Sequence, residues 1–373
     1  MAEGVFRLPS GHWRARYRDA DGRQIGATFD KQLDAVRWRR KQLDALAVGA
    51  HVDPRAGKTT IGDYATERWL PGVVHIRPTT RALYASHLRR HVIPAFGRRQ
   101  LGALRRSDCR SFVSALSTRL APSTVHVVFA VLRSVMQAAV DDGLLAANPC
   151  ARVPLPRIEA RGVDPLPASA VVALADAVPD RYAATVWLAA GAGLREGEAL
   201  GLTVARVDFL RRRVHVEQQV QGVNGGEPTL VPLKTRASRR VVPVDDIVLE
   251  ALTRHMQLWE PGPGGLLVTN RLGRPVRRGS FGSCWRVAVA ECGLPAGTRF
   301  HDLRHFYASS LIRAGLHPKT IQARLGHATF SETMDTYGHL FPDSEESGRG
   351  VLDGVLRLLA VPRSGHVGLG VVE

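Results

Sequence analysis

Four residues within the stretch 300–341, His301, Arg304, His327 and Tyr337, place two imidazoles, a guanidinium and a phenol in an otherwise helical pattern. A second guanidinium and an ammonium group lie upstream of it. The side chains considered together are Arg195, Lys234, His301, Arg304, His327 and Tyr337. Guanidinium groups are planar, permanently charged and able to donate two parallel hydrogen bonds to a phosphate. The set therefore suits the binding of a phosphodiester while a phenol oxygen attacks its phosphorus.

Each group has a chemical task in such a displacement. Arg195 and Arg304 are candidates for a clamp on the non-bridging oxygens of the phosphate. A free phenol has a pKa near ~10, so attack by Tyr337 needs a base or strongly cationic surroundings. The departing deoxyribose oxygen needs a proton, for which Lys234 is the candidate donor. The chain has only five lysines among 51 basic residues, and an arginine cannot release a proton near neutral pH.

The order of these residues along the chain resembles that of the tyrosine recombinases, the phage integrase family. The resemblance rests on Arg195 with Glu198, then Lys234, His301-x-x-Arg304, His327 and Tyr337. It implies a 3′-phosphotyrosyl intermediate formed by Tyr337 and strand exchange between two DNA sites. It further implies that the two arginines and two histidines surround the phosphate. Glu198, one helical turn after Arg195, would orient that arginine or a histidine.

Two other functions remain open. A type IB topoisomerase or telomere resolvase would use the same phosphate-binding set, although a basic N-terminal segment favours an integrase. A non-enzymatic DNA-binding regulator would use these residues only to contact phosphates. A supercoil-relaxation assay and a Tyr337→Phe substitution would separate the three.

Taken singly, each of these residues has an ordinary structural explanation. An isolated arginine is usually a solvated charge, and a lone tyrosine usually packs in a core or an interface. By the same reasoning His305 and His339 are expected to be structural, and Tyr307 is expected to pack in the core. Only the joint pattern favours catalysis.

No metal and no cofactor are expected. His301 and His305 have the i, i+4 spacing of metal ligands on a helix. Arg304 between them would repel a cation, and no Cys or Asp completes the set. The resemblance also implies that the phosphodiester energy is kept in a protein–DNA bond, so ATP is not required.

Composition indicates a nucleic-acid partner. The chain has 373 residues, a formal net charge of +17 and a sequence pI near 10.8. Such a charge favours a polyanion, double-stranded DNA by default, and basic residues spread over the whole chain disfavour a membrane surface. The four cysteines occur singly, and no apolar signal segment or apolar run of membrane-spanning length is present. These features predict a folded cytoplasmic protein with reduced thiols.

Residues 1–55 are predicted to form three short strands and a helix. Arg14, Arg16 and Arg18 alternate with aromatic or small residues, as on one face of an exposed strand. The segment resembles the arm-type DNA-binding domain of some integrases, in which these arginines would lie against a DNA groove. The alternative is a small charged subdomain that only packs on its neighbour.

Residues 60–147 are predicted to be all-helical and resemble the SAM-like core-binding domain of the family, which grips the DNA face opposite the active site. Candidate phosphate contacts here are Arg77, Arg81, Arg89 and Arg90. Phosphate contacts position a protein on DNA without reading its sequence. Each arginine taken alone is more simply a solvated surface charge.

A proline-containing linker, 148–167, leads to the predicted catalytic domain, 164–343. This domain should be mixed α+β, with strands at 206–209, 213–218, 230–233 and 239–243 and Lys234 in the turn between the last two. The fold class is therefore multidomain, mainly α with small β-sheets.

The C-terminal tail, 344–373, carries an apolar stripe on a predicted helix. The resemblance suggests docking onto a neighbouring protomer in a synaptic tetramer on DNA, and packing on its own domain is the equal alternative. The sequence does not reveal the attachment-type sites bound, the need for a directionality or DNA-bending factor, or whether Tyr337 attacks in cis or in trans.

Overall fold

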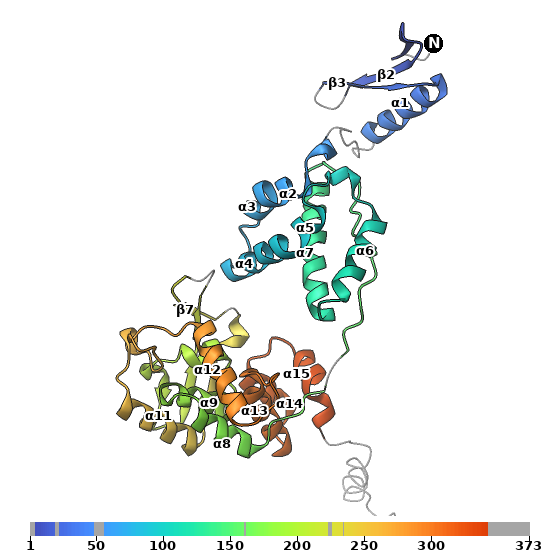
Figure 1. Cartoon of the computed structure of the whole chain (residues 1–373). Helices are drawn as coiled ribbons and strands as arrows, with labels where there is room; N and C mark the ends of the chain where they lie inside the picture. The colour runs from blue at the N-terminus through green and yellow to red at the C-terminus, as the bar shows by residue number, and fades with distance from the viewer. Residues whose placement is uncertain are drawn as a thin grey trace, which may run out of the picture. The chain divides into compact units, whose positions relative to one another are not determined.

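The computed structural model describes residues 4–18, 22–47, 56–159, 162–222, 226–233 and 235–341. Contacts divide the chain into two units, Met1–Ala160 and Arg161–Glu373. Within the described residues the first unit contains two separate hydrophobic cores and the second contains one. The expected mainly helical, multidomain architecture with small sheets is confirmed (Figure 1). The tail helix expected after residue 344 lies outside the described residues.

The N-terminal part is an antiparallel sheet of β1 (Val5–Arg7), β2 (Trp13–Arg18) and β3 (Gln24–Phe29), with α1 (Gln32–Ala47) against it. Ala15 and Tyr17 on β2 are buried, so the alternating arginines occupy the opposite face of the strand. The guanidinium of Arg16 lies 4.8 Å from the centre of the Phe6 ring. The predicted single face of Arg14, Arg16 and Arg18 is therefore present.

The helical block follows as η1 (Ala56–Lys58), α2 (Ile61–Asp63), η2 (Tyr64–Trp69), α3 (Leu70–Gly72), α4 (Pro78–His87), η3 (Leu88–Val92), α5 (Ile93–Phe96), η4 (Leu101–Ala103), α6 (Arg106–Ser117) and α7 (Pro122–Asp141). Two helical segments widen into π-helix immediately before a proline. The amide of Leu70 donates to the carbonyl of Ala65, and the amide of Ile93 donates to that of Leu88. Pro71 and Pro94 come next in the chain. Because proline has no amide hydrogen to donate to the carbonyl four residues earlier, the helix accommodates it by forming these wider hydrogen bonds.

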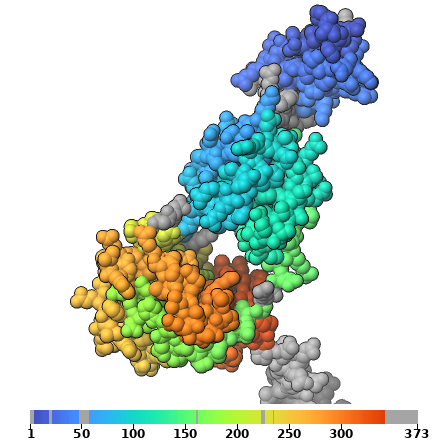
Figure 2. All heavy atoms as spheres, in the orientation of Figure 1, coloured from blue at the N-terminus to red at the C-terminus, as the bar shows by residue number. Residues whose placement is uncertain are grey.

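By length and composition alone, α7 could cross a membrane. Its residues Val125, Val128, Leu132 and Val135 are fully buried in the core of the helical block. We therefore interpret α7 as the central core helix of this block, whose outer surface is drawn in light blue and teal in Figure 2. Candidate DNA-contacting arginines lie on its neighbours: Arg77 directly precedes α4, Arg81 lies within α4, and Arg89 and Arg90 lie in η3.

The second unit contains α8 (Ala168–Ala177), α9 (Asp180–Ala192), α10 (Glu196–Leu200), η5 (Val204–Arg206), β4 (Val207–Asp208), β5 (Arg213–Val216), β6 (Gln218–Gln221), β7 (Thr229–Pro232), η6 (Arg236–Ser238), β8 (Arg240–Pro243), α11 (Asp246–Leu258), η7 (Pro263–Gly265), α12 (Arg278–Glu291), α13 (His301–Arg313), α14 (Pro318–Leu325), α15 (Phe330–Tyr337) and η8 (Gly338–Leu340). The central helix is α9, which packs against α8, α11 and α13. Its buried positions include several alanines, which allow neighbouring helices to approach closely.

The strands pair differently from their order in the chain. The predicted strand 213–218 is two strands: β5 pairs with β4 and β8, whereas β6 pairs with β7 in a separate sheet. Consecutive strands β7 and β8 therefore do not pair with each other. The chain changes sheet at Glu217, whose carbonyl accepts a hydrogen bond from the amide of Leu233.

Candidate active site

Arg195 is positioned by the end of α9. That helix ends at Gly193, which has a left-handed backbone with φ of 65°. A Cβ atom at this position would lie 2.6 Å from the ring of Tyr307. Glycine is therefore required both by the backbone conformation and by the available space. The turn then brings Arg195 to the N-cap of α10, where its side chain is half-buried.

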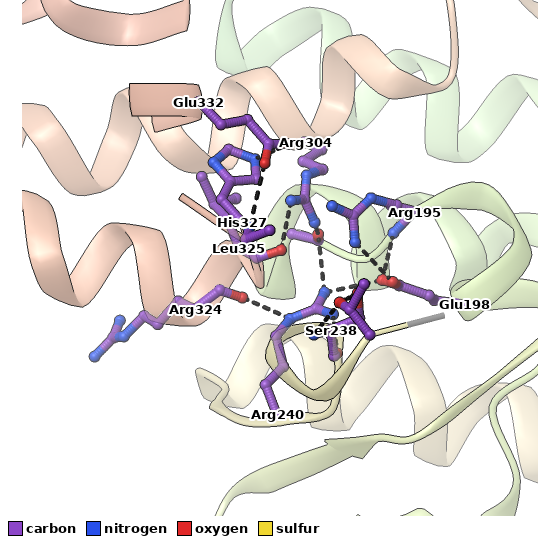
Figure 3. A network of polar contacts seen from close by, with 12 residues as sticks. Arg195, Glu198, Ser238, Arg240, Arg304, Arg324, Leu325, His327 and Glu332 are labelled. Atoms are coloured by element: carbon purple, nitrogen blue, oxygen red, sulfur yellow. Dashed lines mark hydrogen bonds and ion pairs between the residues drawn. The ribbon is translucent and has the colours of Figure 1, made fainter. Parts of the chain in front are cut away.

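Glu198 links two guanidinium groups. It is 2% exposed, and it accepts hydrogen bonds from the amide of Arg195 at 2.9 Å, from Nη1 of Arg195 at 3.0 Å and from Nη2 of Arg240 at 2.9 Å. Figure 3 shows this network. Burial alone would raise the pKa of Glu198, but Arg240 and then Arg195 outweigh it, so the pKa lies below its ordinary value. Glu198 is thus an ionised carboxylate between two cations.

Arg304 is the most enclosed cation of the site, with 1% of its surface exposed. Its Nη1 donates to the carbonyl of Gly193 at 2.6 Å, and its Nη2 donates to the carbonyl of Leu325 (Figure 3). Its Nε has no hydrogen-bond partner among the described residues. Burial, followed by the charges of Arg195 and Arg240, lowers the pKa of Arg304 to about 9. The group remains charged at neutral pH and has one unused donor.

His327 follows the end of α14. Gly326 ends that helix in a left-handed conformation with φ of 65°, and Nδ1 of His327 lies 2.9 Å from the hydroxyl of Thr333 on α15. Nε2 is 3.8 Å from Glu332. Burial, then Arg304 and Arg195, lowers the pKa of His327 to about 3. The ring is therefore neutral at physiological pH.

His301 lies at the first residue of α13 and is exposed to solvent as a whole residue. Its ring meets the ring of His305 edge-on, with centroids 4.9 Å apart. Partial burial, then His305 and Arg304, lowers the pKa of His301 to about 4. His301 is thus a neutral imidazole on the open side of the site.

Tyr337, the last residue of α15, is 1% exposed. Its hydroxyl lies 2.8 Å from Nδ1 of His305, and its ring stacks on His327 with centroids 6.4 Å apart. Burial raises the pKa of Tyr337 to about 12, although the charges of Arg304 and Arg195 act to lower it. The phenol and both guanidiniums therefore belong to one cluster within a single chain.

Three family models of phage integrase domains match this chain. Residues 166–343 match the Phage integrase family, residues 4–47 match the N-terminal domain of phage integrases, and residues 62–117 match their N-terminal SAM-like domain. The chain belongs to the phage integrase family. By enzyme class it is a tyrosine recombinase.

Relatives of this integrase family member span nearly its whole length. The integrase of Mycobacterium phage L5 is 29% identical over 86% of this chain and 89% of its own length. A putative prophage phiRv2 integrase of Mycobacterium tuberculosis is 29% identical over 87% of this chain and 88% of its own length. A XerC-like tyrosine recombinase of Caldanaerobacter subterraneus is 26% identical over 87% of this chain and 90% of its own length.

Solved integrase structures share the fold. The Tn1549 transposon integrase in complex with transposon right end DNA has a TM-score of 0.65 and 20% identity, covering 81% of this chain and 100% of that one. A lambda integrase tetramer bound to a Holliday junction has a TM-score of 0.58 and 16% identity, covering 89% and 97%.

Two residues of this integrase site were missed in the sequence. His305 was expected to be structural, yet it contacts the hydroxyl of Tyr337. Its spacing of four residues from His301 was the available signal, since both side chains then lie on one face of a helix. Arg240 is buried and donates to Glu198, to the carbonyl of Arg324 and, at 3.4 Å, to that of Gly193. An arginine within the apolar strand 240–243 was its only signal.

The remaining residues singled out in the sequence lie partly in this unit, partly in the other unit and partly outside the described residues. Tyr307 packs in the core as expected, and Nε2 of His339 contacts the carbonyl of Val163. Lys234 lies outside the described residues, so its role stays a prediction. The arginines of the N-terminal sheet and the helical block belong to the other unit. Among the described residues, no group of three His, Cys, Asp or Glu side chains could hold a metal ion.

Proposed function

We propose that this integrase is a site-specific recombinase that integrates or excises a mobile element by cutting and rejoining double-stranded DNA through a phosphotyrosyl bond. Tyr337 is the nucleophile. One observation carries the proposal: the phenol of Tyr337 is enclosed with Arg195, Arg304 and neutral histidines of its own chain. A solvated surface tyrosine of a DNA-binding regulator would need no such surroundings.

The scissile phosphate would be held by the two arginines. Arg304 has an unused Nε donor, and one Nη of Arg195 bonds Glu198 while the side chain stays half-exposed. Donors fixed before the reaction stabilise the charge that develops on the non-bridging oxygens without reorganising. Neutral His301 and His327 would add N–H donors without adding charge. The fixed carbonyl and carboxylate contacts of Arg304 and Arg195 support this pre-organisation.

Departure of the sugar oxygen requires a proton. Lys234 is the proposed donor, because a lysine can release a proton when its surroundings are cationic, whereas arginine cannot. In the sequence, Lys234 follows the buried Leu233 and precedes Thr235, which caps η6, and Arg240 of the site follows shortly after η6.

Tyr337 would attack in cis. The phenol, Arg304 and Arg195 interact electrostatically within one chain. Partners of the proposed enzyme are double-stranded DNA carrying attachment-type sites, three further copies in a synaptic tetramer, and a directionality or DNA-bending factor. Lambda integrase has been solved as a dimer on a core site and as a tetramer on a Holliday junction. The proposed compartment is the cytoplasm of a bacterial host.

Trapping on DNA tests the proposal. Duplexes selected by binding from a random pool are nicked beside the cleavage position, so that the released strand end diffuses away and the covalent adduct accumulates. The wild-type chain is expected to form the adduct, with Tyr337 as the labelled residue by mass spectrometry. Tyr337→Phe should bind the same duplexes with unchanged Kd and form none.

Tyr307→Phe is the matched control, because it removes a phenol hydroxyl from the same domain outside the proposed nucleophile position. It should keep adduct formation. Adduct formation by Tyr337→Phe at the wild-type rate would overturn the assignment. Relaxation of supercoiled DNA that lacks a selected site would favour a topoisomerase instead.

A further inference from the structure

We infer that His305 is the proton acceptor for the nucleophile, taking the hydroxyl hydrogen of Tyr337 on its Nδ1 as the phenol oxygen attacks phosphorus. The inference rests on the proposed function. It assigns a catalytic task to a histidine that the motif residues do not include.

The contact is direct and enclosed. Nδ1 of His305 lies 2.8 Å from the hydroxyl oxygen of Tyr337, a normal length for a hydrogen bond. The two rings meet at 64° with centroids 5.5 Å apart, so the imidazole edge faces the phenol. Tyr337 is 1% exposed, and bulk water therefore has little access to its hydroxyl. A proton acceptor in this state has to be a protein group already in contact.

The other histidines are less suited to the task. His327 stacks on Tyr337 with its ring plane only 8° from parallel, and its Nδ1 is engaged by Thr333. A stacked ring presents its face, and a ring face carries no nitrogen lone pair. His301 packs edge-on against His305. Among the described residues, His305 is the one whose side chain is hydrogen-bonded to the hydroxyl of Tyr337.

The charge state of His305 fits an acceptor. Burial lowers its pKa; Asp302 opposes this shift and Arg304 adds to it. His301 faces it on the same helix, and Tyr337 faces it from α15. A neutral imidazole with its hydrogen on Nε2 leaves the Nδ1 lone pair directed at the phenol.

The step balances as follows. A bond forms between the phenol oxygen and phosphorus, the phenol O–H bond breaks, and the proton moves to Nδ1, which leaves His305 as imidazolium. The bond from phosphorus to the departing sugar oxygen breaks, and that oxygen takes a proton from the general acid. Rejoining runs in reverse, and His305 returns its proton to Tyr337.

DNA binding would bring the pKa values of His305 and Tyr337 closer together. The phosphate anion stabilises an imidazolium beside it, and both guanidiniums stabilise a phenol oxygen that is losing its hydrogen. Proton transfer is most effective when it accompanies formation of the new bond. The pair is thus inactive without DNA and competent with it.

Two substitutions separate proton transfer from positioning. His305→Asn places an amide oxygen near the position of Nδ1, which can hold the hydroxyl but cannot take its proton. His305→Ala removes both abilities. Single-turnover adduct formation on the nicked duplex is measured against pH, together with the DNA Kd and the melting temperature.

We expect His305→Asn to lower the rate of adduct formation about 10²- to 10⁴-fold, which is the usual contribution of a general base. The Kd for DNA should be unchanged. Its rate should keep rising with pH where the wild-type rate levels off. Replacing Tyr337 by a fluorinated tyrosine of lower pKa should recover more rate in His305→Asn than in the wild-type chain.

His317→Asn is the control. His317 caps α14 by accepting from the amide of Lys319, and asparagine caps a helix equally well, so the rate should be unchanged. A wild-type rate in His305→Asn, with or without a loss in His305→Ala, would overturn the assignment. Absence of any adduct from the wild-type chain would instead reject the proposed function.

Discussion

At the scale of single residues, the site depends on one buried carboxylate among several cations. The side chains of Glu198 and Arg240 are 1% and 4% exposed, and their charged atoms lie 2.9 Å apart. A buried ion pair adds little net stability, because both groups lose their hydration. Its value here is positional: Glu198 fixes Arg195, and Arg240 joins that carboxylate to the carbonyl of Arg324. Removing one partner leaves the other charge buried and unpaired.

We therefore expect Glu198→Gln to destabilise the protein by about 3 kcal/mol and to slow adduct formation. Urea unfolding and the trapping assay measure the two effects. Glu196→Gln is the matched control, because Glu196 pairs with Arg278 and the side chains of Arg278 and Glu196 are 63% and 20% exposed. A pair with one solvent-exposed partner contributes about 1 kcal/mol. Equal losses in the two variants would contradict the positional role of Glu198.

The buried histidine of the site predicts acid sensitivity. The folded chain holds the pKa of His327 at about 3, against about 6.5 when unfolded. Between these values the unfolded chain binds more protons, so stability rises with pH and is lost as the pH falls below 6.5. His327 should account for about 2 kcal/mol of lost unfolding free energy between pH 7.5 and pH 5.

Urea unfolding at several pH values tests whether the free energy of unfolding rises with pH as expected. His327→Asn should flatten the dependence, because the amide keeps an acceptor or donor for Thr333 and does not titrate. A profile that is as steep in the variant as in the wild-type chain would show that other groups cause the effect.

At the scale of elements, the end of α9 organises the site. Gly193 turns the chain toward Arg195, and its carbonyl accepts a hydrogen bond from Arg304 on α13. The helices α9 and α13 pack side by side (Figure 1). One peptide group thus sets the separation of the two proposed phosphate-binding arginines.

Gly193→Ala should therefore reduce stability and adduct formation by more than the strain of a left-handed backbone alone would cause. The new Cβ would lie 2.6 Å from the Tyr307 ring. Gly315→Ala is the matched control, with φ of +74° and nothing within 4 Å of its new Cβ. We expect a loss of about 1 kcal/mol for Gly315→Ala, and a larger loss with strongly reduced adduct formation for Gly193→Ala. Similar behaviour of the two variants in melting and trapping assays would refute this account.

At the scale of the whole molecule, charge governs the proposed encounter with DNA. The chain carries +17 formally, and each phosphate neutralised releases counterions. The arginine face of β2 presents three of these charges on the side opposite Ala15 and Tyr17. Contacts of this kind add affinity and salt dependence without base recognition.

Replacing Arg14, Arg16 and Arg18 together with alanine should reduce the slope of log Kobs against log salt by up to about 2.7, that is about 0.9 for each contact. Fluorescence anisotropy at several salt concentrations measures it. The control replaces Arg37, Arg40 and Lys41 on the exposed surface of α1, which removes the same charge from another surface. Identical slopes in both triple variants would indicate a general charge effect and no arm contact.

The sequence by itself determined the local secondary structure and the types of reactive side chain that the site can use. Proline opens α4 at Pro78 and α7 at Pro122, the helix position that proline favours, and the alternation of β2 is visible over six residues. The order of Arg195, His301, Arg304, His327 and Tyr337 indicated the family, because a reaction needs particular side-chain types.

Only the tertiary structure decided which groups meet. The contact of His305 with Tyr337 joins residues 32 apart, that of Arg240 with Glu198 joins residues 42 apart, and that of Arg304 with Gly193 joins residues 111 apart. The pairing of β7 with β6 and of β8 with β5 is likewise set at long range. Local propensity carries no information about such partners, because they are selected by the packing of whole helices around α9.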